Sequence, residues 1–230
     1  MSDTASSSAP VGSSAPVGGG DLSVIRFTNG PWKQNCFILH GLRDADGADT
    51  AVVVDPGSDA DAIAELLDSR SLRPLAIVNT HGHFDHIGAV ADLAERYGIA
   101  FHIHSGDNRL LRSANTYRFL FGAKAAIRVP ENAVPVPDGE LRVGGYAFEV
   151  IPTPGHTPGS VCLRIGKLLF TGDTVLPSSP GRTDLPGGNA AELKESLRRL
   201  RLLPGDLEVH SGHGSPRLLG DIWKSHDAAA

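Results

Sequence analysis

The sequence predicts one α/β domain in which strands and helices pack in layers. A chain of 230 residues, 40% hydrophobic and 20% charged, can bury one sizeable core and has the composition of a globular protein. Its first half alternates short apolar runs with segments of helical periodicity. Its second half contains paired apolar runs separated by glycine-containing breaks, which are typical of β-hairpins. Alternation of this kind favours sheets covered by helices.

In the first half, predicted strands alternate with predicted helices. The strands are expected at residues 22–27, 35–39, 51–54, 75–79 and 99–104. The third strand stops at the turn signature Asp55-Pro56-Gly57, after which Ser58 or Asp59 is expected to cap the first helix. The second helix follows the segment 80–86 and is expected to end at Gly98, because glycine readily adopts the left-handed conformation at a helix C-terminus.

The second half is expected to be richer in strands. Residues 108–120 are compatible with a helix, whereas the alternation of Tyr117, Phe119 and Phe121 also fits a strand or a loop lining. Two hairpins are then predicted, one at 141–143 with 146–151 and one at 160–165 with 168–171. A long loop is expected at 176–188, a helix at 190–202 and a short strand at 207–209. No element is predicted for the tail 215–230.

The composition bears on partners and location. The formal net charge is −5 and no long basic run occurs, so a nucleic-acid partner is not expected. No apolar stretch approaches the ~20 residues of a membrane span, and the two cysteines form no disulfide framework. Residues 1–20 contain a repeated Ser-Ser-Ala-Pro-Val-Gly segment and predict a disordered low-complexity tail, which leaves 21–230 as a single domain. That tail lacks the features of a signal peptide, so a cytoplasmic location is expected.

One heptad, Thr80-His81-Gly82-His83-Phe84-Asp85-His86, concentrates metal-ligating side chains. Imidazole is the commonest metal ligand, and carboxylates join it on zinc, iron or manganese. In an extended segment His81 and His83 point to the same side, and a helix that starts behind them would place His86 about one turn beyond His83. A strand, a loop and a helix in succession could therefore aim all these groups at one point.

Three further candidate ligands each follow a predicted strand and adjoin glycine: His156, Asp173 and His213. With the heptad they make five histidines and two aspartates, which is enough for two metal ions that share a bridging carboxylate. We assign His81, His83 and His156 to one ion, Asp85, His86 and His213 to the other, and Asp173 to the bridge.

These motifs, together with Asp55, resemble those of the metallo-β-lactamase superfamily in order and separation. The resemblance covers residues 22–214 and implies a four-layer αβ/βα sandwich with metals at one edge between the two sheets. It also implies that Asp55 braces the metal-binding loop without itself being a ligand.

Within that superfamily, three segments look like those of compact glyoxalase II-like hydrolases, also called type II hydroxyacylglutathione hydrolases. The segments are 34–36, 121–122 and 181–188. The resemblance implies that a metal-bound hydroxide cleaves a thioester, such as an S-(2-hydroxyacyl) conjugate of a small thiol similar to S-lactoylglutathione. Asp85 would orient the water and carry its proton. Two divalent ions are implied, zinc first, with iron or manganese as alternatives.

The substrate is expected to be a small-molecule thioester whose identity depends on the segment 109–122. We assign substrate contacts to Tyr117, Phe119, Phe121 and Arg182, and we also expect Arg182 and Asp184 to form an ion pair that braces their loop. Glyoxalase II proper carries a C-terminal helical domain whose basic residues hold glutathione, whereas only the tail 215–230 follows here. The carrier thiol and the oligomeric state therefore stay open.

Three other functions are weighed against thioester hydrolysis. Persulfide dioxygenases share the fold and a Gly-Arg-Thr-Asp segment but use one iron, at positions equivalent to His81, His156 and Asp173. They typically have alanine in place of Phe84 and no Gly-His-Gly ending, which disfavours them here. Lactonase or β-lactamase activity has less support. A non-enzymatic metal-binding or scaffold protein would not need the complete ligand set.

Overall fold

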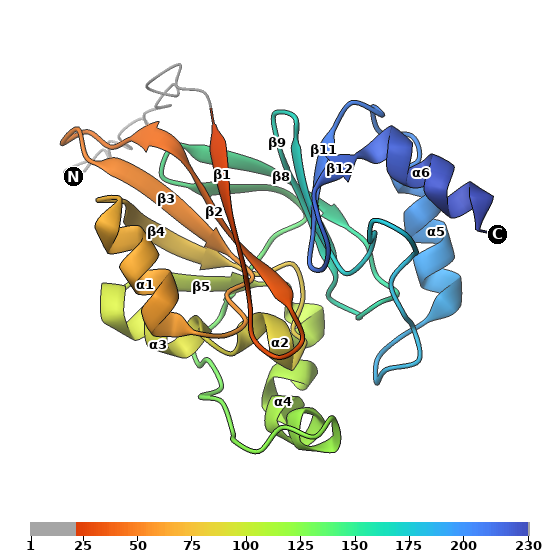
Figure 1. Ribbon diagram of the computed structural model, residues 1–230, viewed down its shortest axis with the longest axis horizontal. Coiled ribbons are helices and arrows are strands. Elements are labelled where there is room, and N and C mark those ends of the chain that lie inside the picture. The colour runs from red at the N-terminus through yellow and green to blue at the C-terminus, as the bar shows by residue number, and fades with distance from the viewer. Residues whose placement is uncertain (1–21, 230) are drawn as a thin grey trace, which may run out of the picture.

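Two six-stranded sheets face each other in the computed structural model, which describes residues 22–229 (Figure 1). The tail predicted for residues 1–20 lies outside the described residues. The first sheet has the order β1 (Ser23–Asn29), β2 (Gln34–Arg43), β3 (Asp49–Val54), β4 (Arg73–Val78), β5 (Ala100–Ile103) and β6 (Val134–Pro135). The second has the order β12 (Arg217–Leu218), β11 (Glu208–Ser211), β10 (Leu168–Gly172), β9 (Val161–Ile165), β8 (Tyr146–Pro152) and β7 (Gly139–Val143).

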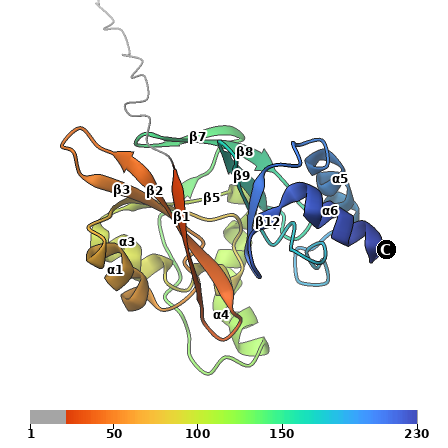
Figure 2. The same ribbon diagram turned by 45° about the horizontal axis from the view of Figure 1, so that its top comes forward.

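Helices cover the outer face of each sheet. α1 (Ala60–Ser69) and α3 (Val90–Tyr97) lie on the first sheet, and α5 (Ala190–Leu200) and α6 (Leu219–Ala228) lie on the second. Figure 2 shows the two sheets between these helix pairs. The four-layer αβ/βα sandwich implied by the resemblance is thereby confirmed.

Strand alternation explains why the first sheet is buried on both faces. Cys36 and Ile38 of β2 pack with α1 and α3, whereas Phe37 and Leu39 pack with the second sheet. Successive side chains of a strand point to opposite faces, so one unbroken apolar run supplies both cores. Between the sheets, the hydroxyl of buried Tyr146 donates a hydrogen bond to the Thr50 carbonyl at 2.7 Å.

The helix predicted after the heptad is interrupted. Its first turn is the short helix α2 (Phe84–Ile87), and α3 begins only at Val90. The backbone N–H of Ala89 donates to the Pro56 carbonyl at 3.0 Å instead of continuing the helix, and a Cβ at Gly88 would collide with the Gly57 carbonyl. Close packing against the loop after β3 therefore separates the two helices. Gly98 ends α3 with φ 63°, as predicted.

Asp59 occupies the N-cap position of α1, as predicted, but it has φ 57° and its side chain makes no capping hydrogen bond. Its carboxylate instead accepts a hydrogen bond from the Gly30 N–H at 3.3 Å. The side chain therefore ties the start of α1 to the turn between β1 and β2.

Residues 108–120 form helix α4 (Asn108–Leu120), so the strand alternative for its aromatics is wrong. Tyr117 and Phe121 lie one turn apart, with the Phe121 N–H donating to the Tyr117 carbonyl at 3.0 Å. Residues two apart on a helix point in different directions. Phe119 accordingly lies away from these two, with half of its surface exposed.

The segment 215–230, for which no element was predicted, contributes β12 and α6 to the fold. Leu219, Ile222, Trp223 and His226 are buried at the i, i+3, i+4, i+7 spacing of a helix, and the first three belong to the core beside the second sheet. Sequence periodicity therefore contained the signal for α6. β6 was also not predicted, because its two residues leave too short a pattern.

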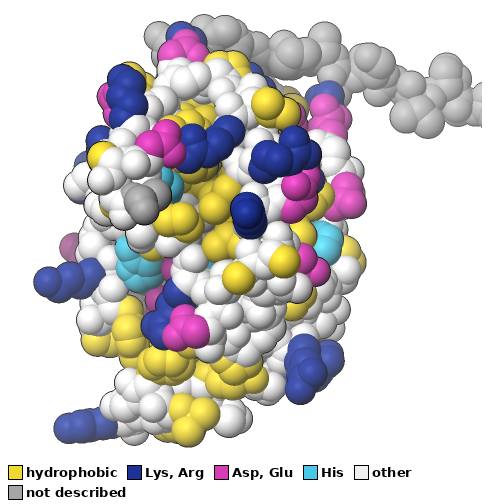
Figure 3. All heavy atoms as spheres, turned by 90° about the vertical axis from the view of Figure 1, so that its right-hand side faces the viewer, with side chains coloured by type: hydrophobic (Ala, Val, Ile, Leu, Met, Phe, Trp, Pro, Cys, Tyr) yellow, Lys and Arg dark blue, Asp and Glu magenta, His cyan; other side chains and the backbone are white. Residues whose placement is uncertain are grey.

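No helix within residues 22–229 has both the length and the apolar character that crossing a membrane requires. The face that carries α5 and α6 mixes cationic and anionic side chains (Figure 3). Arg198 of α5 forms an ion pair with Glu195 at 2.8 Å, and Arg201, directly after α5, forms one with Asp227 at 2.6 Å.

Candidate metal centre

Loops from both sheets converge at one edge of the sandwich and carry the predicted ligands. His81 and His83 follow β4, and His86 lies in α2. His156 lies between β8 and β9, Asp173 directly follows β10, and His213 follows β11. The structure therefore brings together residues that are far apart in the sequence, and the four ligand-bearing loops all lie at the ends of strands.

The predicted ligands form two compact groups. In each group, one nitrogen or carboxylate oxygen per residue lies within 4.8 Å of the others. The first group is His81, His83 and His156, and the second is Asp85, His86 and His213. A third group within the same distance, Asp55, His81 and His86, shares one histidine with each of them.

Asp173 lies between the two groups. One carboxylate oxygen is 3.6 Å from His86 Nε2, and the other is 3.7 Å from His156 Nε2 and 3.5 Å from His213 Nε2. A single carboxylate thus contacts members of both sets. This is the position that a bridging ligand between two ions requires.

The donor atoms of this cluster fit a metal site. The Nε2 atoms of His81, His83, His86 and His156 are buried without a hydrogen-bond partner, and so is one Asp173 oxygen. Buried polar atoms in native proteins are nearly always partnered, so several unpartnered atoms that converge need an explanation. Metal coordination supplies one, because neutral imidazole and carboxylate are ligand groups for zinc, iron and manganese. The cluster is thus able to bind metal ions.

The electrostatics differ between the two groups. Burial, together with the neighbouring His156, lowers the pKa of His83 to about 3, so its imidazole stays neutral. For His86 burial also lowers the pKa, but Asp85, Asp173 and Asp55 outweigh it and raise the pKa to about 10. A cation bound beside these carboxylates would take the place of that proton, as metal binding to histidine generally does.

Asp55 braces the heptad from the end of β3. Its carboxylate accepts hydrogen bonds from the Thr80 N–H at 2.8 Å and the Thr80 hydroxyl at 2.6 Å. The Asp55 oxygen that accepts from the Thr80 hydroxyl also lies 3.3 Å from His86 Nδ1. A carboxylate behind a histidine orients its ring and strengthens its basicity if that histidine binds a metal.

A comparable contact holds His156, whose Nδ1 lies 2.8 Å from the Arg182 carbonyl oxygen. The predicted ion pair in this loop is present, with Arg182 Nε and Nη2 each 2.7 Å from an Asp184 oxygen. The loop 181–188 thus contacts a ligand through its backbone, while its own geometry is held by a side-chain pair. The sequence predicted that pair but not the contact with His156.

Asp107 connects two of these loops, a position that the sequence analysis did not predict. It is completely buried, and its carboxylate accepts hydrogen bonds from the Gly82 N–H at 2.7 Å and the Gly159 N–H at 2.7 Å. The Thr157 hydroxyl donates a third at 2.8 Å. Asp107 thereby joins the loop of His81 and His83 to the loop of His156. These partners lie far away in the chain, so no local spacing could have indicated the role.

A cavity of about 220 Å³ opens onto the centre, with His83, Asp85, His156, Asp173 and His213 in its wall. Its remaining lining residues are Trp32, Phe84, Phe121, Arg182 and Leu185. Of the predicted substrate contacts, Phe121 and Arg182 line this cavity. Tyr117 lines a different cavity of about 200 Å³, and Phe119 lines neither.

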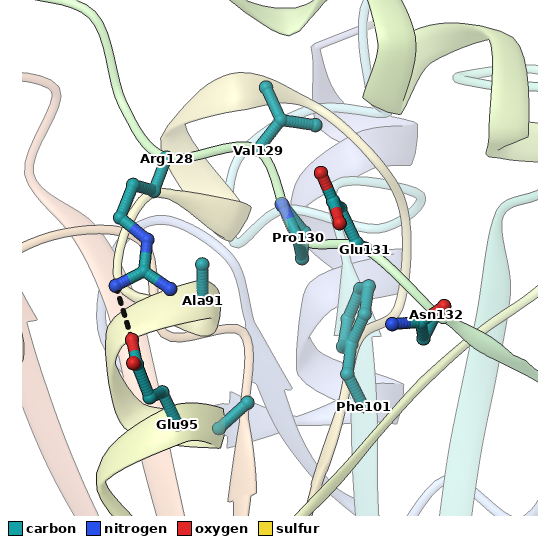
Figure 4. Close-up of a pocket in the computed structure, with 9 residues that line it drawn as sticks. Ala91, Glu95, Phe101, Arg128, Val129, Pro130, Glu131 and Asn132 are labelled. Atoms are coloured by element: carbon teal, nitrogen blue, oxygen red, sulfur yellow. Dashed lines mark hydrogen bonds and ion pairs between the residues drawn. The ribbon is translucent and has the colours of Figure 1, made fainter.

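A larger cavity, of about 570 Å³, lies between α3, β5 and the segment 128–132 (Figure 4). Ala91 and Phe101 form part of its wall, and Arg128 pairs with Glu95 at its rim at 2.6 Å. None of the predicted ligands lines it. The side chains that could bind a cation therefore line the smaller cavity, not this one.

Fold and site together define an αβ/βα sandwich with a metal-binding histidine and aspartate cluster at the edge between its sheets. The sequence profile of the metallo-beta-lactamase superfamily matches residues 29–213, and the chain belongs to that superfamily.

Two relatives bear on function. "Probable metallo-hydrolase YqgX" of Bacillus subtilis is 35% identical over 194 residues, which are 82% of this chain and 89% of the relative. "Hydroxyacylglutathione hydrolase GloC" of Haemophilus influenzae is 31% identical over 218 residues, which are 90% of this chain and 96% of the relative.

Solved structures resemble this one over most of its length. TTHA1623 in a di-iron-bound form has a TM-score of 0.79 and 35% identity, covering 88% of this chain and 98% of the other. The B3 metallo-beta-lactamase BLEG-1 has a TM-score of 0.78 and 34% identity, covering 88% and 97%. ETHE1 from Myxococcus xanthus has a TM-score of 0.68 and 28% identity, covering 86% and 80%.

Proposed function

We propose that this chain is a thioester hydrolase with two metal ions, acting on an S-(2-hydroxyacyl) conjugate of a small thiol. The observation that carries the proposal is the position of Asp173, within 3.7 Å of ligand nitrogens from both groups. Two ions bridged by one carboxylate are a hydrolytic arrangement. The resemblance to a hydroxyacylglutathione hydrolase supports the substrate class.

The first ion would be held by His81, His83 and His156, the second by Asp85, His86 and His213, with Asp173 between them. Zinc is the first candidate, and the di-iron form of TTHA1623 makes iron the second, with manganese a further alternative. Bound there, the ions would supply Lewis acids that lower the pKa of a coordinated water to about 7.

The chain's own residues would direct the reaction. Asp85, in the wall of the cavity and 3.5 Å from His213 Nε2, is placed to accept a proton from water. The water oxygen bonds to the acyl carbon, the C–S bond breaks, and sulfur leaves with the electron pair. The proton held by Asp85 then passes to the thiolate or to solvent. A thiol has a pKa near 8.5, so its departure needs no strong acid in the cavity.

An iron-dependent persulfide dioxygenase is the second candidate, and the similarity to ETHE1 favours it. That activity would need one iron at His81, His156 and Asp173. A one-iron enzyme of this kind would not use the second group, Asp85, His86 and His213, as metal ligands. The presence of this second group is why we place the hydrolase first. Lactonase or β-lactamase activity is a third candidate, and the similarity to BLEG-1 favours the latter.

The test uses the metal-free protein reloaded with zinc, iron or manganese, with bound metal counted per chain. Thiol release from S-lactoylglutathione and oxygen uptake with glutathione persulfide are then measured in parallel. We expect two ions per chain, thiol release and no oxygen uptake. Oxygen uptake with one iron per chain would overturn the proposal.

His213→Ala sharpens the distinction between the two candidates. It removes a member of the second group alone, so thiol release should fall by at least about 100-fold if two ions are needed. A dioxygenase that relies on His81, His156 and Asp173 would keep its oxygen uptake in this variant. Hydrolysis of a lactone and of a β-lactam, measured on the same samples, tests the third candidate.

A further inference from the structure

An aromatic wall, formed by Trp32, Phe84 and Phe121, lines the cavity at the metal centre. The rings of Trp32 and Phe84 meet edge to face with centroids 4.9 Å apart, and those of Phe84 and Phe121 are 5.8 Å apart. These distances are those of aromatic pairs in contact. The three residues come from the turn after β1, from α2 and from the end of α4, so the wall exists only in the folded chain.

The aromatic wall begins at the ligands themselves, because Phe84 stands between His83 and Asp85 in the sequence. It continues outward to Phe121, which is 44% exposed, and the Arg118 guanidinium lies 5.2 Å from the Trp32 ring centroid. Apolar surface that is open to solvent beside a binding centre is stabilised when an apolar group covers it.

The size of the cavity indicates which part of a substrate it accepts. About 220 Å³ is below the roughly 300–1,000 Å³ of sites that enclose a drug-sized ligand, so an entire glutathione conjugate does not fit. The reacting carbonyl must lie at the ligands. Of the two substituents of that carbonyl, we place the acyl group in the cavity and the polar carrier outside, because the lining beside the ligands is largely apolar.

Building on the proposed hydrolase function, we propose that the aromatic wall binds the acyl substituent and selects thioesters with an aromatic or bulky apolar acyl group. A small lactoyl group, with its single methyl, would leave most of the wall uncovered. A phenyl substituent would cover it, chiefly by ring contact with the exposed part of Phe121, since Phe84 is only 7% exposed.

The experiment compares S-mandeloylglutathione with S-lactoylglutathione on the zinc-loaded protein. The two conjugates share the thiol and the 2-hydroxyl and differ in phenyl against methyl. Because one methylene in an apolar pocket already changes kcat/KM by about 10-fold or more, we expect the mandeloyl conjugate to be preferred at least about 10-fold. Mandelate should also inhibit more strongly than lactate, which reports binding without turnover.

Variants separate the contribution of the aromatic wall to this preference from the difference in intrinsic reactivity between the two conjugates. Phe121→Ala should reduce the mandeloyl-to-lactoyl ratio of kcat/KM by at least about 10-fold. Phe119→Ala is the matched control, because Phe119 belongs to the same helix and is also exposed but does not line the cavity. It should leave the ratio unchanged. Trp32→Leu is a second variant of the wall and should also lower the ratio.

The outcomes distinguish two failures. If neither conjugate is hydrolysed with any of the three metals, the proposed function is wrong and this inference falls with it. If both are hydrolysed but lactoyl is preferred, or if neither Phe121→Ala nor Trp32→Leu changes the ratio, the chain is a hydrolase and the acyl-pocket inference alone is wrong.

Discussion

The Thr157 hydroxyl donates a hydrogen bond to the Asp107 carboxylate at 2.8 Å, although the two residues are 50 positions apart. Thr157 directly follows the ligand His156 and belongs to the second-sheet half of the site, whereas the same carboxylate also accepts from Gly82 in the heptad. One buried side chain therefore sets the distance between two ligand loops.

Asp107→Asn is expected to weaken zinc binding by about 10- to 100-fold, the usual cost of losing a residue that orients ligands. The amide keeps the shape of the carboxylate, but its NH2 group cannot accept from an N–H or hydroxyl donor. Zinc affinity is measured by competition with a chromophoric chelator. Asp206→Asn, at an exposed surface pair with Lys167, serves as the control. An Asp107→Asn protein with wild-type zinc affinity would show that this carboxylate does not position the ligands.

Asp173→Ala is expected to lower the metal content by at least one ion per chain and turnover by at least about 100-fold. The carboxylate contacts ligands of both groups, so its removal affects both ions. Metal analysis and thiol release are measured together, and circular dichroism checks the fold. Asp138→Ala, whose carboxylate is exposed, is the control. Full turnover in Asp173→Ala would contradict the assignment of a shared bridge.

Gly212→Ala is expected to damage the centre without unfolding the sandwich. A Cβ at this position would lie 2.6 Å from His86 Cε1 and would collide with the Asp173 carboxylate. Displacing such groups by about 1 Å is enough to reduce turnover by about 100-fold. Gly205→Ala is the control, since its Cβ would meet its nearest atom at an ordinary 3.4 Å. Equal turnover in the two variants would contradict the expected collision.

His210 predicts a specific response of stability to acid. Its ring stacks on Phe170 with centroids 5.2 Å apart and meets Phe37 edge to face at 5.3 Å. Burial, and secondarily Arg26, lowers the pKa of His210 from 6.5 to about 4, even though a Glu208 oxygen lies 3.3 Å from its Nε2. As the pH falls below 6.5, the unfolded chain takes up the proton first. Stability from this residue is therefore lost progressively until about pH 4.

His210→Phe removes that titration and keeps an aromatic ring against Phe37 and Phe170. The free energy of unfolding of the variant, relative to that of the wild type, should increase by about 3 kcal/mol between pH 7 and pH 4. Urea unfolding of both proteins at several pH values gives this difference. The acid sensitivity of the ligand histidines is common to both proteins and cancels. Parallel stability curves would mean that His210 titrates normally.

Much of the candidate site was predictable because its signals are local. The heptad brings its ligands together within seven positions, and His156, Asp173 and His213 each adjoin a glycine at the end of a strand. Trp32 and Asp107 have no such signal. Their contacts reach Phe84 and Thr157, and contacts at that sequence separation leave no trace in spacing or periodicity.

The sequence by itself determined the chemistry of the ligand groups and the alternation of strands and helices in the first half. Side-chain type and apolar periodicity are properties of neighbouring residues, so both are legible along the chain. Only the tertiary structure decided that Phe121 lines the cavity while Phe119 does not, and that Asp107 joins two ligand loops. The spacing of the aromatic residues in 117–121 was compatible with either a strand or a helix, and packing selected the helix. Which distant loops meet depends on how the two sheets pair and pack, and local patterns do not encode that choice.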